Sequence, residues 1–371
     1  MYNLEGEYDC KEFVVERRYK DFIGYREILL KNWPGFFIPP IPPKTFFESK
    51  EEGFVNMRMK YLQQFFNRIF CCPHLIASPE TKIFLEPNVV KFLKVPKELY
   101  YKSYSEIYEN YEEYLYFLKD YEINDKIKGY VNNFYFLVLR LKENIENYVN
   151  ISIKSQNVQI ELNRNIEKFY ENFYDFDNFF IMDMMKVEKE KKENYNQDLI
   201  ECKLTENLYS YNYENSFNTI YEWVIQELVD IEAMVESISS IYNYHDLFIK
   251  KFSQLQKENE NLKKMNNPSF LKSFFSSTDL GKIQQKCFEV NCLSKEVEVI
   301  KKLSDFMYKI VFYMEIPIYK ADKIKFYDHY LKYLYENEQY KSEKSNLIYE
   351  HLKEHSYKFL NMFKDYKEKN N

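Results

Sequence analysis

Glycine and proline, the two residues that most often interrupt helices, are scarce in most of this chain. The sequence of 371 residues contains 6 Gly and 11 Pro, and most of the prolines precede residue 80. Because Gly favours turns and Pro ends or kinks a helix, a long stretch with few of either favours long helices. From about Leu99 to the end we therefore predict helix, and an aromatic content of 19% supplies apolar material for a core.

One part of this helical region carries a regular heptad seam. Its positions recur at alternating steps of four and three, and they are Val224, Leu228, Ile231, Val235, Ile238, Tyr242, His245, Ile249 and Phe252. Such a seam predicts a long helix in a coiled-coil-like bundle. His245 is expected to be a buried core histidine, with a pH-sensing role as the alternative.

A second apolar run drifts between steps of three and four, which suits a helix with more than one neighbour. Its members are Ile283, Cys287, Val290, Leu293, Val297, Ile300, Leu303, Met307, Ile310 and Met314. Earlier helices are expected over about 103–195, broken near 120–128, and over about 203–265. The breaker at Asn266 to Pro268 should end at Gly281, and Pro317 should kink the last helix.

The first ninety residues have shorter patterns. Residues from about Tyr8 to Glu16 predict one strand, and Asp21 is expected to cap a helix that continues to about Lys31. Trp33-Pro34-Gly35 should end that helix, an extended loop should cover 34–44, and a further helix should run over about 56–71.

Cationic and aromatic residues occur on three of these expected elements. Arg17-Arg18-Tyr19 stands at the strand-to-helix junction, Lys44 follows the proline-rich run Ile38 to Pro43, and Arg58 lies on the next helix. Arginine offers a planar fork of donors for phosphate, lysine offers a point charge, and a tyrosine face can lie against a sugar-like ring. The pattern predicts a pocket for a phosphorylated ring.

These motifs resemble those of the PX domain of the sorting nexin family. The matching segments are Arg17-Arg18-Tyr19-Lys20-Asp21-Phe22, the proline loop ending in Lys44, and Arg58-Met-Lys-Tyr-Leu62-Gln-Gln-Phe65. The resemblance implies that Arg18 grips the 3-phosphate of phosphatidylinositol 3-phosphate and that Tyr19 packs under the inositol ring. It assigns Lys44 to the 1-phosphate and Arg58 to the 4- and 5-hydroxyls.

A PX domain has two further strands before the strand that carries the Arg-Arg-Tyr. With room for one strand before Arg17, we expect the domain to be amino-terminally incomplete in this sequence.

The carboxyl-terminal part is similar in length, position and pattern to the BAR domain that follows PX in many sorting nexins. The expected fold is thus an α+β PX domain followed by an all-α bundle of three long helices that dimerises. We expect the PX domain at 1–96, a linker or amphipathic helix at 97–128, and the BAR-like domain at 129–371. The resemblance leaves open whether the dimer joins like or unlike chains.

Two further segments are candidates for membrane contact. Phe46 and Phe47 follow the proline loop and would dip into the lipid interface, or would pack inward instead. The turn between the second and third long helices is basic, and its candidate cations are Lys263, Lys264 and Lys272. Cations of this kind suit anionic headgroups, whereas an ordinary solvated loop is the alternative.

Several other functions find little support. The net charge is −6 and no dense basic face appears, so nucleic acid is not an expected partner. No apolar run is long enough for a spanning helix, and the six scattered cysteines predict reduced thiols. His351, Glu354 and His355 match a zinc-peptidase pattern, but we interpret them as a solvated helix face and expect no catalytic site, cofactor or metal.

The resemblance implies a non-enzymatic, cytoplasmic protein that is peripheral on the early endosome membrane and acts in sorting and tubulation. Its expected partners are phosphatidylinositol 3-phosphate, the anionic membrane surface, a second subunit and a retromer-like coat or cargo. The alternative is a helical scaffold or tether whose degenerate PX domain binds protein rather than lipid.

Overall fold

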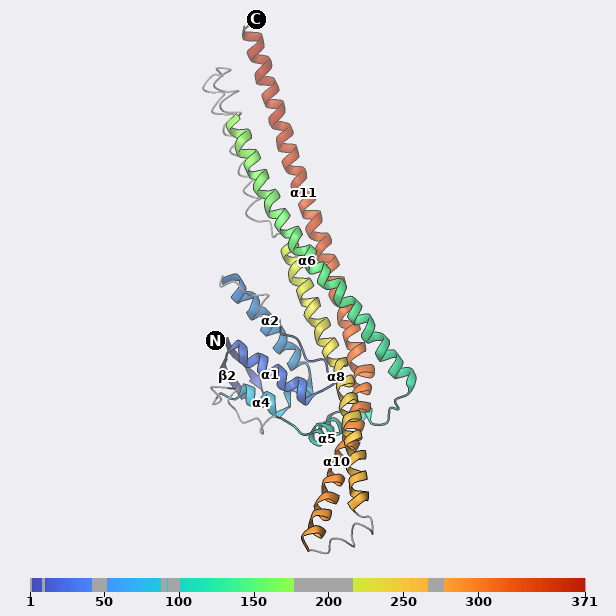
Figure 1. Cartoon of the computed structure of the whole chain (residues 1–371). Coiled ribbons are helices and arrows are strands. Elements are labelled where there is room, and N and C mark those ends of the chain that lie inside the picture. The colour runs from blue at the N-terminus through green and yellow to red at the C-terminus, as the bar shows by residue number, and fades with distance from the viewer. Residues whose placement is uncertain are drawn as a thin grey trace. The chain divides into compact units, whose positions relative to one another are not determined.

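The computed structural model describes residues 2–8, 11–41, 52–87, 92, 101–176, 216–265 and 277–370 (Figure 1). The chain divides into two compact units, the first made of Met1–Glu143 with Glu227–Ala321 and the second of Asn144–Gln226 with Asp322–Asn371. The amino-terminal elements are β1 (Tyr2–Tyr8), β2 (Lys11–Arg17), α1 (Tyr19–Asn32), α2 (Glu52–Phe70), α3 (Pro73–Ile76) and α4 (Pro79–Leu85). The later elements are α5 (Tyr104–Tyr114), the 3-10 turn η4 (Tyr116–Leu118), α6 (Asp125–Phe176), α8 (Ser216–Met265), α10 (Ser277–Ile310), the π-turn η6 (Val311–Glu315) and α11 (Ile316–Asn370).

The first seventeen residues contain two strands, so the prediction of a single strand was wrong. β1 and β2 are antiparallel, with Tyr2 opposite Arg17 and Tyr8 opposite Lys11. One face of this sheet is exposed, so β1 contains several polar residues. These residues interrupt the apolar pattern by which a strand is predicted from sequence. Gly6 lies opposite Phe13, where an added Cβ would come within 3.1 Å of the ring.

Helix α1 begins earlier than predicted, because Arg18 rather than Asp21 is its N-cap residue. The backbone N–H of Arg18 donates to Oδ2 of Asp21 at 2.8 Å. Asp21 therefore lies in the first turn, where its carboxylate satisfies a backbone donor at the positive end of the helix.

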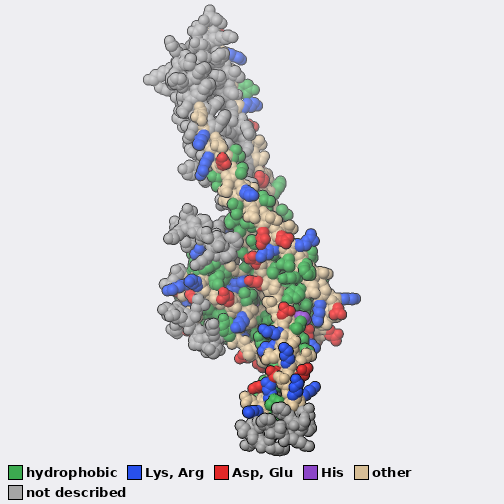
Figure 2. Space-filling model, viewed as in Figure 1, with side chains coloured by type: hydrophobic (Ala, Val, Ile, Leu, Met, Phe, Trp, Pro, Cys, Tyr) green, Lys and Arg blue, Asp and Glu red, His purple; other side chains and the backbone are tan. Residues whose placement is uncertain are grey.

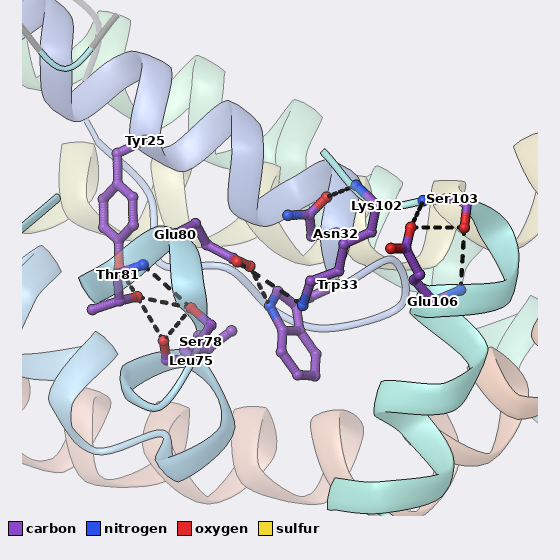
Figure 3. A network of polar contacts seen from close by, with 10 residues as sticks. All are labelled: Tyr25, Asn32, Trp33, Leu75, Ser78, Glu80, Thr81, Lys102, Ser103 and Glu106. Carbon is purple, nitrogen blue, oxygen red and sulfur yellow. Dashed lines mark hydrogen bonds and ion pairs between the residues drawn. The ribbon is translucent and has the colours of Figure 1, made fainter. Parts of the chain in front are cut away.

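Aromatic rings form the core of the amino-terminal domain. The fully buried Tyr25 stacks on Phe84 with ring centroids 4.4 Å apart, and it meets Phe65 edge-on at 6.0 Å. Its hydroxyl bonds Oγ1 of Thr81 at 2.5 Å, within a polar network that also contains Ser78 (Figure 3). This network supplies hydrogen bonds for hydroxyl groups that the packed rings would otherwise leave unsatisfied.

Arg17 joins the end of β2 to the end of α4. Its side chain is 2% exposed and donates from Nε to the carbonyl of Phe84 and from Nη2 to the carbonyl of Glu86, both at 2.9 Å. A helix leaves its last carbonyls without helical donors, and a cation there also favours the helix dipole. Burial lowers the pKa of Arg17, opposed by the nearby carboxylate of Asp21.

Helix α1 ends at a tight turn, as the Trp33-Pro34-Gly35 motif predicts. Gly35 has φ of 89°, and a side chain there would come within 3.0 Å of Met307 on α10. Glycine is required both by the backbone conformation and by this close approach. Trp33 is fully buried and donates from Nε1 to Glu80 at 2.8 Å (Figure 3).

The expected break between the first helices is present. Ser103 caps α5 together with Glu106, and Asn124 accepts a bond from the backbone N–H of Ile127 in the first turn of α6. Helix α5 packs against α10. Residues 177–215, where the first long helix was expected to end and the second to begin, lie outside the described residues.

The heptad seam of α8 is buried in its first half only. Val224, Leu228 and Ile231 are buried, but Ile249 is 50% exposed. His245 is exposed, so its predicted place in the core was wrong. The second apolar run is buried or half-buried along α10 and η6, and Gly281 lies inside α10 rather than at its start.

The helix irregularity near Pro317 is a π-turn. The N–H of Ile316 bonds the carbonyl of Val311, five residues back, and α11 begins at Ile316. Pro317 has no N–H to offer the carbonyl four residues before it, and such a missing donor favours a local change of register.

In the second unit, aromatic side chains of α11 surround Trp223 of α8. The Trp223 ring lies 5.0 Å from those of Phe326 and Tyr330, and it stacks on His329 at 5.3 Å. The Tyr330 hydroxyl also bonds that of Tyr148 on α6 at 2.9 Å. These contacts join three helices within this unit.

Replacing Arg17 by Met should lower the stability of the chain by about 3 kcal/mol, because the carbonyls it serves lose a charged donor. The exposed Arg18→Met change is the matched control and should alter stability by about 0.5 kcal/mol or less. Urea unfolding followed by circular dichroism measures both. Equal shifts of the midpoint would contradict the structural role of Arg17.

Glu315 in the π-turn is 8% exposed and accepts a hydrogen bond from the backbone N–H of Phe37. Burial raises its pKa from 4.5 to about 8, with the Phe37 bond opposing the shift. The same carboxylate adds to the raised pKa of Cys72, for which burial is the main cause. In the folded state Glu315 therefore holds a proton that the unfolded chain releases between these two pH values.

Stability from this proton should be complete below pH 4.5 and should be lost as pH rises through about 8. Glu315→Gln keeps a neutral side chain at every pH. We expect it to flatten this part of the pH profile and to stabilise the protein at alkaline pH by on the order of 3 kcal/mol. Thermal melts across the range, with exposed Glu109→Gln as control, test this. A profile as steep as the wild type would show that Glu315 is ionised in the fold.

Candidate functional site

The strand-to-helix junction separates the two neighbouring arginines. Successive residues of a strand point to opposite sides, and here Arg17 is buried whereas Arg18 is exposed. Arg18 is also the N-cap of α1, next to the positive end of the helix. Its position leaves a guanidinium at the surface, where an anion can reach it.

Tyr19 and Arg58 lie together beside this junction. Tyr19, in the first turn of α1, is 9% exposed, and the Arg58 guanidinium carbon is 5.3 Å from the centre of its ring. Burial raises the pKa of the Tyr19 hydroxyl, and the positive charge of Arg58 opposes that shift. The structure thus pairs two of the four predicted headgroup residues, Tyr19 and Arg58. Arg18 precedes Tyr19 in the chain and is exposed.

Tyr2 is part of the same cluster, although the sequence analysis did not include it. Nη1 of Arg58 lies 3.5 Å from the Tyr2 hydroxyl, and the Tyr2 ring meets Phe22 edge-on at 5.9 Å. Tyr2 is brought to this cluster because it pairs with Arg17 across the β1–β2 hairpin. That pairing requires the β1 strand, which the pattern did not reveal.

The other predicted contact residues divide into two groups. Lys44, Phe46, Phe47 and Lys272 lie outside the described residues. Lys263 and Lys264 are exposed in the last turn of α8. Near them, Lys286 of α10 pairs with Glu258 at 2.8 Å. Lys and Arg side chains are numerous over the lower ends of α8 and α10 in Figure 2.

In the part of the chain that the structure describes, no group of three or more His, Cys, Asp or Glu could hold a metal ion. His351 and His355 lie within α11, but their side chains are outside the described set. Among the described helices, none has the length and apolar composition needed to cross a bilayer.

Residues 7–88 match the family model of the PX domain. Sorting nexin-7 of Homo sapiens is 39% identical over 84 residues, covering 22% of this chain and 22% of that protein. Sorting nexin 1 of Arabidopsis thaliana is 39% identical over 84 residues, covering 22% of this chain and 21% of its own length. The matched segment therefore spans about a fifth of these relatives.

The similarity of fold extends much further than the similarity of sequence. The cryo-EM structure of the SNX-BAR Mvp1 tetramer has a TM-score of 0.52 with this chain, over 91% of this chain and 90% of that one, at 14% identity. At this identity the likeness concerns the fold alone. The chain therefore contains a PX domain at residues 7–88, and its overall fold resembles that of a PX-BAR sorting nexin.

Proposed function

We propose that this chain is a peripheral membrane protein that binds a phosphorylated inositol lipid and acts in endosomal sorting and membrane tubulation. The observation that carries the proposal is the contact between Tyr19 and Arg58 at the β2–α1 junction, where the residue before Tyr19 is the exposed Arg18. The planar guanidinium group of arginine can donate two hydrogen bonds to a phosphate, and a tyrosine ring can pack against the face of the inositol.

Phosphatidylinositol 3-phosphate is the proposed ligand within this class. Arg18 would hold the 3-phosphate, Tyr19 would support the ring, Lys44 would meet the 1-phosphate and Arg58 the 4- and 5-hydroxyls. This division follows the PX motifs in the sequence. We place the protein on the cytoplasmic side of early endosomes, where a retromer-like coat or cargo would be further partners.

The helical part would add a second membrane contact and a second subunit. Lys263 and Lys264, with Lys272 in the following segment, would meet anionic headgroups. Apolar side chains remain exposed on α11, including Ile324 at 72% and Leu331 at 63%. We propose that a second subunit, of the same or another chain, covers them. We keep 1–96, 97–128 and 129–371 as the proposed domain boundaries.

Arg18→Gln should reduce the affinity for vesicles with phosphatidylinositol 3-phosphate by at least about tenfold, because the 3-phosphate loses its charged donor. Flotation of the full chain with vesicles that contain or lack this lipid measures the effect. Lys82→Gln removes an exposed cation elsewhere in the domain and should leave binding unchanged. If the wild-type chain ignores the lipid, the scaffold or tether alternative is favoured.

Replacing Lys263, Lys264 and Lys272 by Glu should weaken binding to anionic vesicles but preserve the preference for the inositol lipid. At about 1 kcal/mol for each cation near the surface, the loss should reach on the order of a hundredfold. The matched control replaces three exposed lysines of the first unit, Lys126, Lys295 and Lys301, by Glu. An equal loss in both triple variants would assign the effect to net charge alone.

A further inference from the structure

The PX domain is attached to α8 by an ion pair between Arg68 of α2 and Asp230. Nη1 and Nη2 of the arginine meet Oδ1 and Oδ2 of the carboxylate at 2.6 and 3.0 Å. The Asp230 side chain is 2% exposed, whereas that of Arg68 is 40% exposed. A two-pronged contact of this kind fixes both distance and orientation.

A second ion pair lies six residues further along α8. Arg26 of α1 contacts Oε2 of Glu236 at 2.5 Å, and it also donates to the carbonyls of Pro39 at 2.8 Å and Ile38 at 3.3 Å. One guanidinium therefore connects α1, the proline loop and α8.

The turn after α1 makes the third attachment. Ser237 of α8 donates from its hydroxyl to the carbonyl of Gly35 at 2.7 Å, and Gly35 also lies against Met307 of α10. Asp230 and Ser237 are seven residues apart, which places them on one face of the helix. This face of α8 is distinct from the apolar seam, and it meets the PX domain with polar groups.

Burial makes the Asp230 contact selective. A buried carboxylate is costly unless a cation and hydrogen bonds compensate for it. A shift of α2 along α8 would leave the carboxylate without the guanidinium, whereas an apolar contact would tolerate such a shift. The ion pair therefore favours one position of the PX domain on α8.

The two helices that form this pair also carry the two proposed membrane contacts. Arg58 lies ten residues before Arg68 on α2, and Lys263 lies 33 residues after Asp230 on α8. At 1.5 Å per residue these separations are about 15 and 50 Å along continuous helices. The Arg68–Asp230 pair thus joins the headgroup side chain to the basic end of α8 through two continuous helix segments.

We infer that Arg68 and Asp230, assisted by Arg26 and Glu236, are positioning residues that hold the headgroup site and the basic end of α8 at one fixed separation. The inference rests on the proposed function. With this separation fixed, binding at the first contact places the second at the membrane with a high effective concentration. Without the ion pairs, the contacts of Gly35 with Ser237 and Met307 remain, but they hold the two sites at a less sharply defined separation.

The test removes both carboxylates in one variant, Asp230→Asn with Glu236→Gln. Changing Asp230 is milder than changing Arg68, because the arginine left behind is partly exposed. The control, Asp246→Asn with Glu260→Gln, makes the same charge change at exposed positions of the same helix. Loss of negative charge alone should strengthen binding to anionic vesicles in both variants.

Two binding measurements on the full chain separate positioning from pocket chemistry. The first is calorimetry with a soluble short-chain phosphatidylinositol 3-phosphate, and the second is flotation with vesicles that contain this lipid and phosphatidylserine. We expect the Asp230/Glu236 variant to bind the soluble lipid within about twofold of wild type and to bind vesicles about tenfold more weakly. The control variant should lose neither.

A distance measurement keeps the inference testable if binding is altered through misfolding. Spin labels at exposed Lys82 of α4 and Lys250 of α8, in a chain whose native cysteines are replaced, should give one narrow distance distribution. The Asp230/Glu236 variant should broaden it while a thermal melt still shows a cooperative transition.

Undiminished vesicle binding, an equal loss for soluble lipid and vesicles, or an unchanged distance distribution would overturn the positioning role and leave the proposed function intact. A wild-type chain that binds neither form of the lipid would overturn the proposed function, and the positioning role with it.

Discussion

Three buried acidic side chains hold the PX domain against the helices that surround it. Glu80, 0% exposed, accepts from Trp33 and lies 3.9 Å from Lys102, just before α5. Asp230 of α8 pairs with Arg68, and Glu315 of the π-turn accepts from the backbone of Phe37. The partners across the contact are Lys102 for Glu80, Arg68 for Asp230 and the Phe37 backbone for Glu315. Burying a carboxylate, or a neutral carboxyl group such as that of Glu315, is costly without partners, so the set favours a single docked arrangement.

This arrangement explains the contrasting roles of the paired arginines at the start of α1. Arg17 donates to the carbonyls at the end of α4, and its burial keeps its guanidinium away from a ligand at the surface. Arg18, on the opposite side of the strand, is exposed. Tyr19 and Arg58, which contact each other, belong to α1 and α2, and these two helices share an aromatic core. The proposed pocket thus depends on the packing that Arg17 supports.

Sequence analysis could find the long helices, the break before α6 and the cations of the proposed site. These features carry local signals, such as periodicity, capping residues and a compact motif. It missed β1, because the exposed Asn3, Glu5 and Glu7 obscured the alternation with partly buried Tyr2 and Leu4. It also placed the N-cap three residues late, since Asp21 suits either position by composition.

The residue pattern predicted the structure least well along α8. A heptad seam describes a helix with one apolar neighbour, whereas this helix meets the PX domain through a second, polar face. Asp230 and Ser237 are buried there, while the seam residue Phe252 is 42% exposed. Nothing in the spacing of Asp230 distinguishes a buried, paired carboxylate from a solvated one. Only the partner, Arg68, separated by 162 residues, makes the difference.

The charge distribution indicates how the docked position of the PX domain would affect the orientation of the protein on a membrane. Residues 1–96 contain 14 Lys and Arg against 12 Asp and Glu, whereas the remainder contains 38 against 46. An anionic membrane would therefore repel most of the helical part and attract the PX site and the basic end of α8. Such a surface favours orientations that bring both attractive regions to the lipid together. Only a fixed connection between them turns this preference into a defined pose of the protein on the membrane.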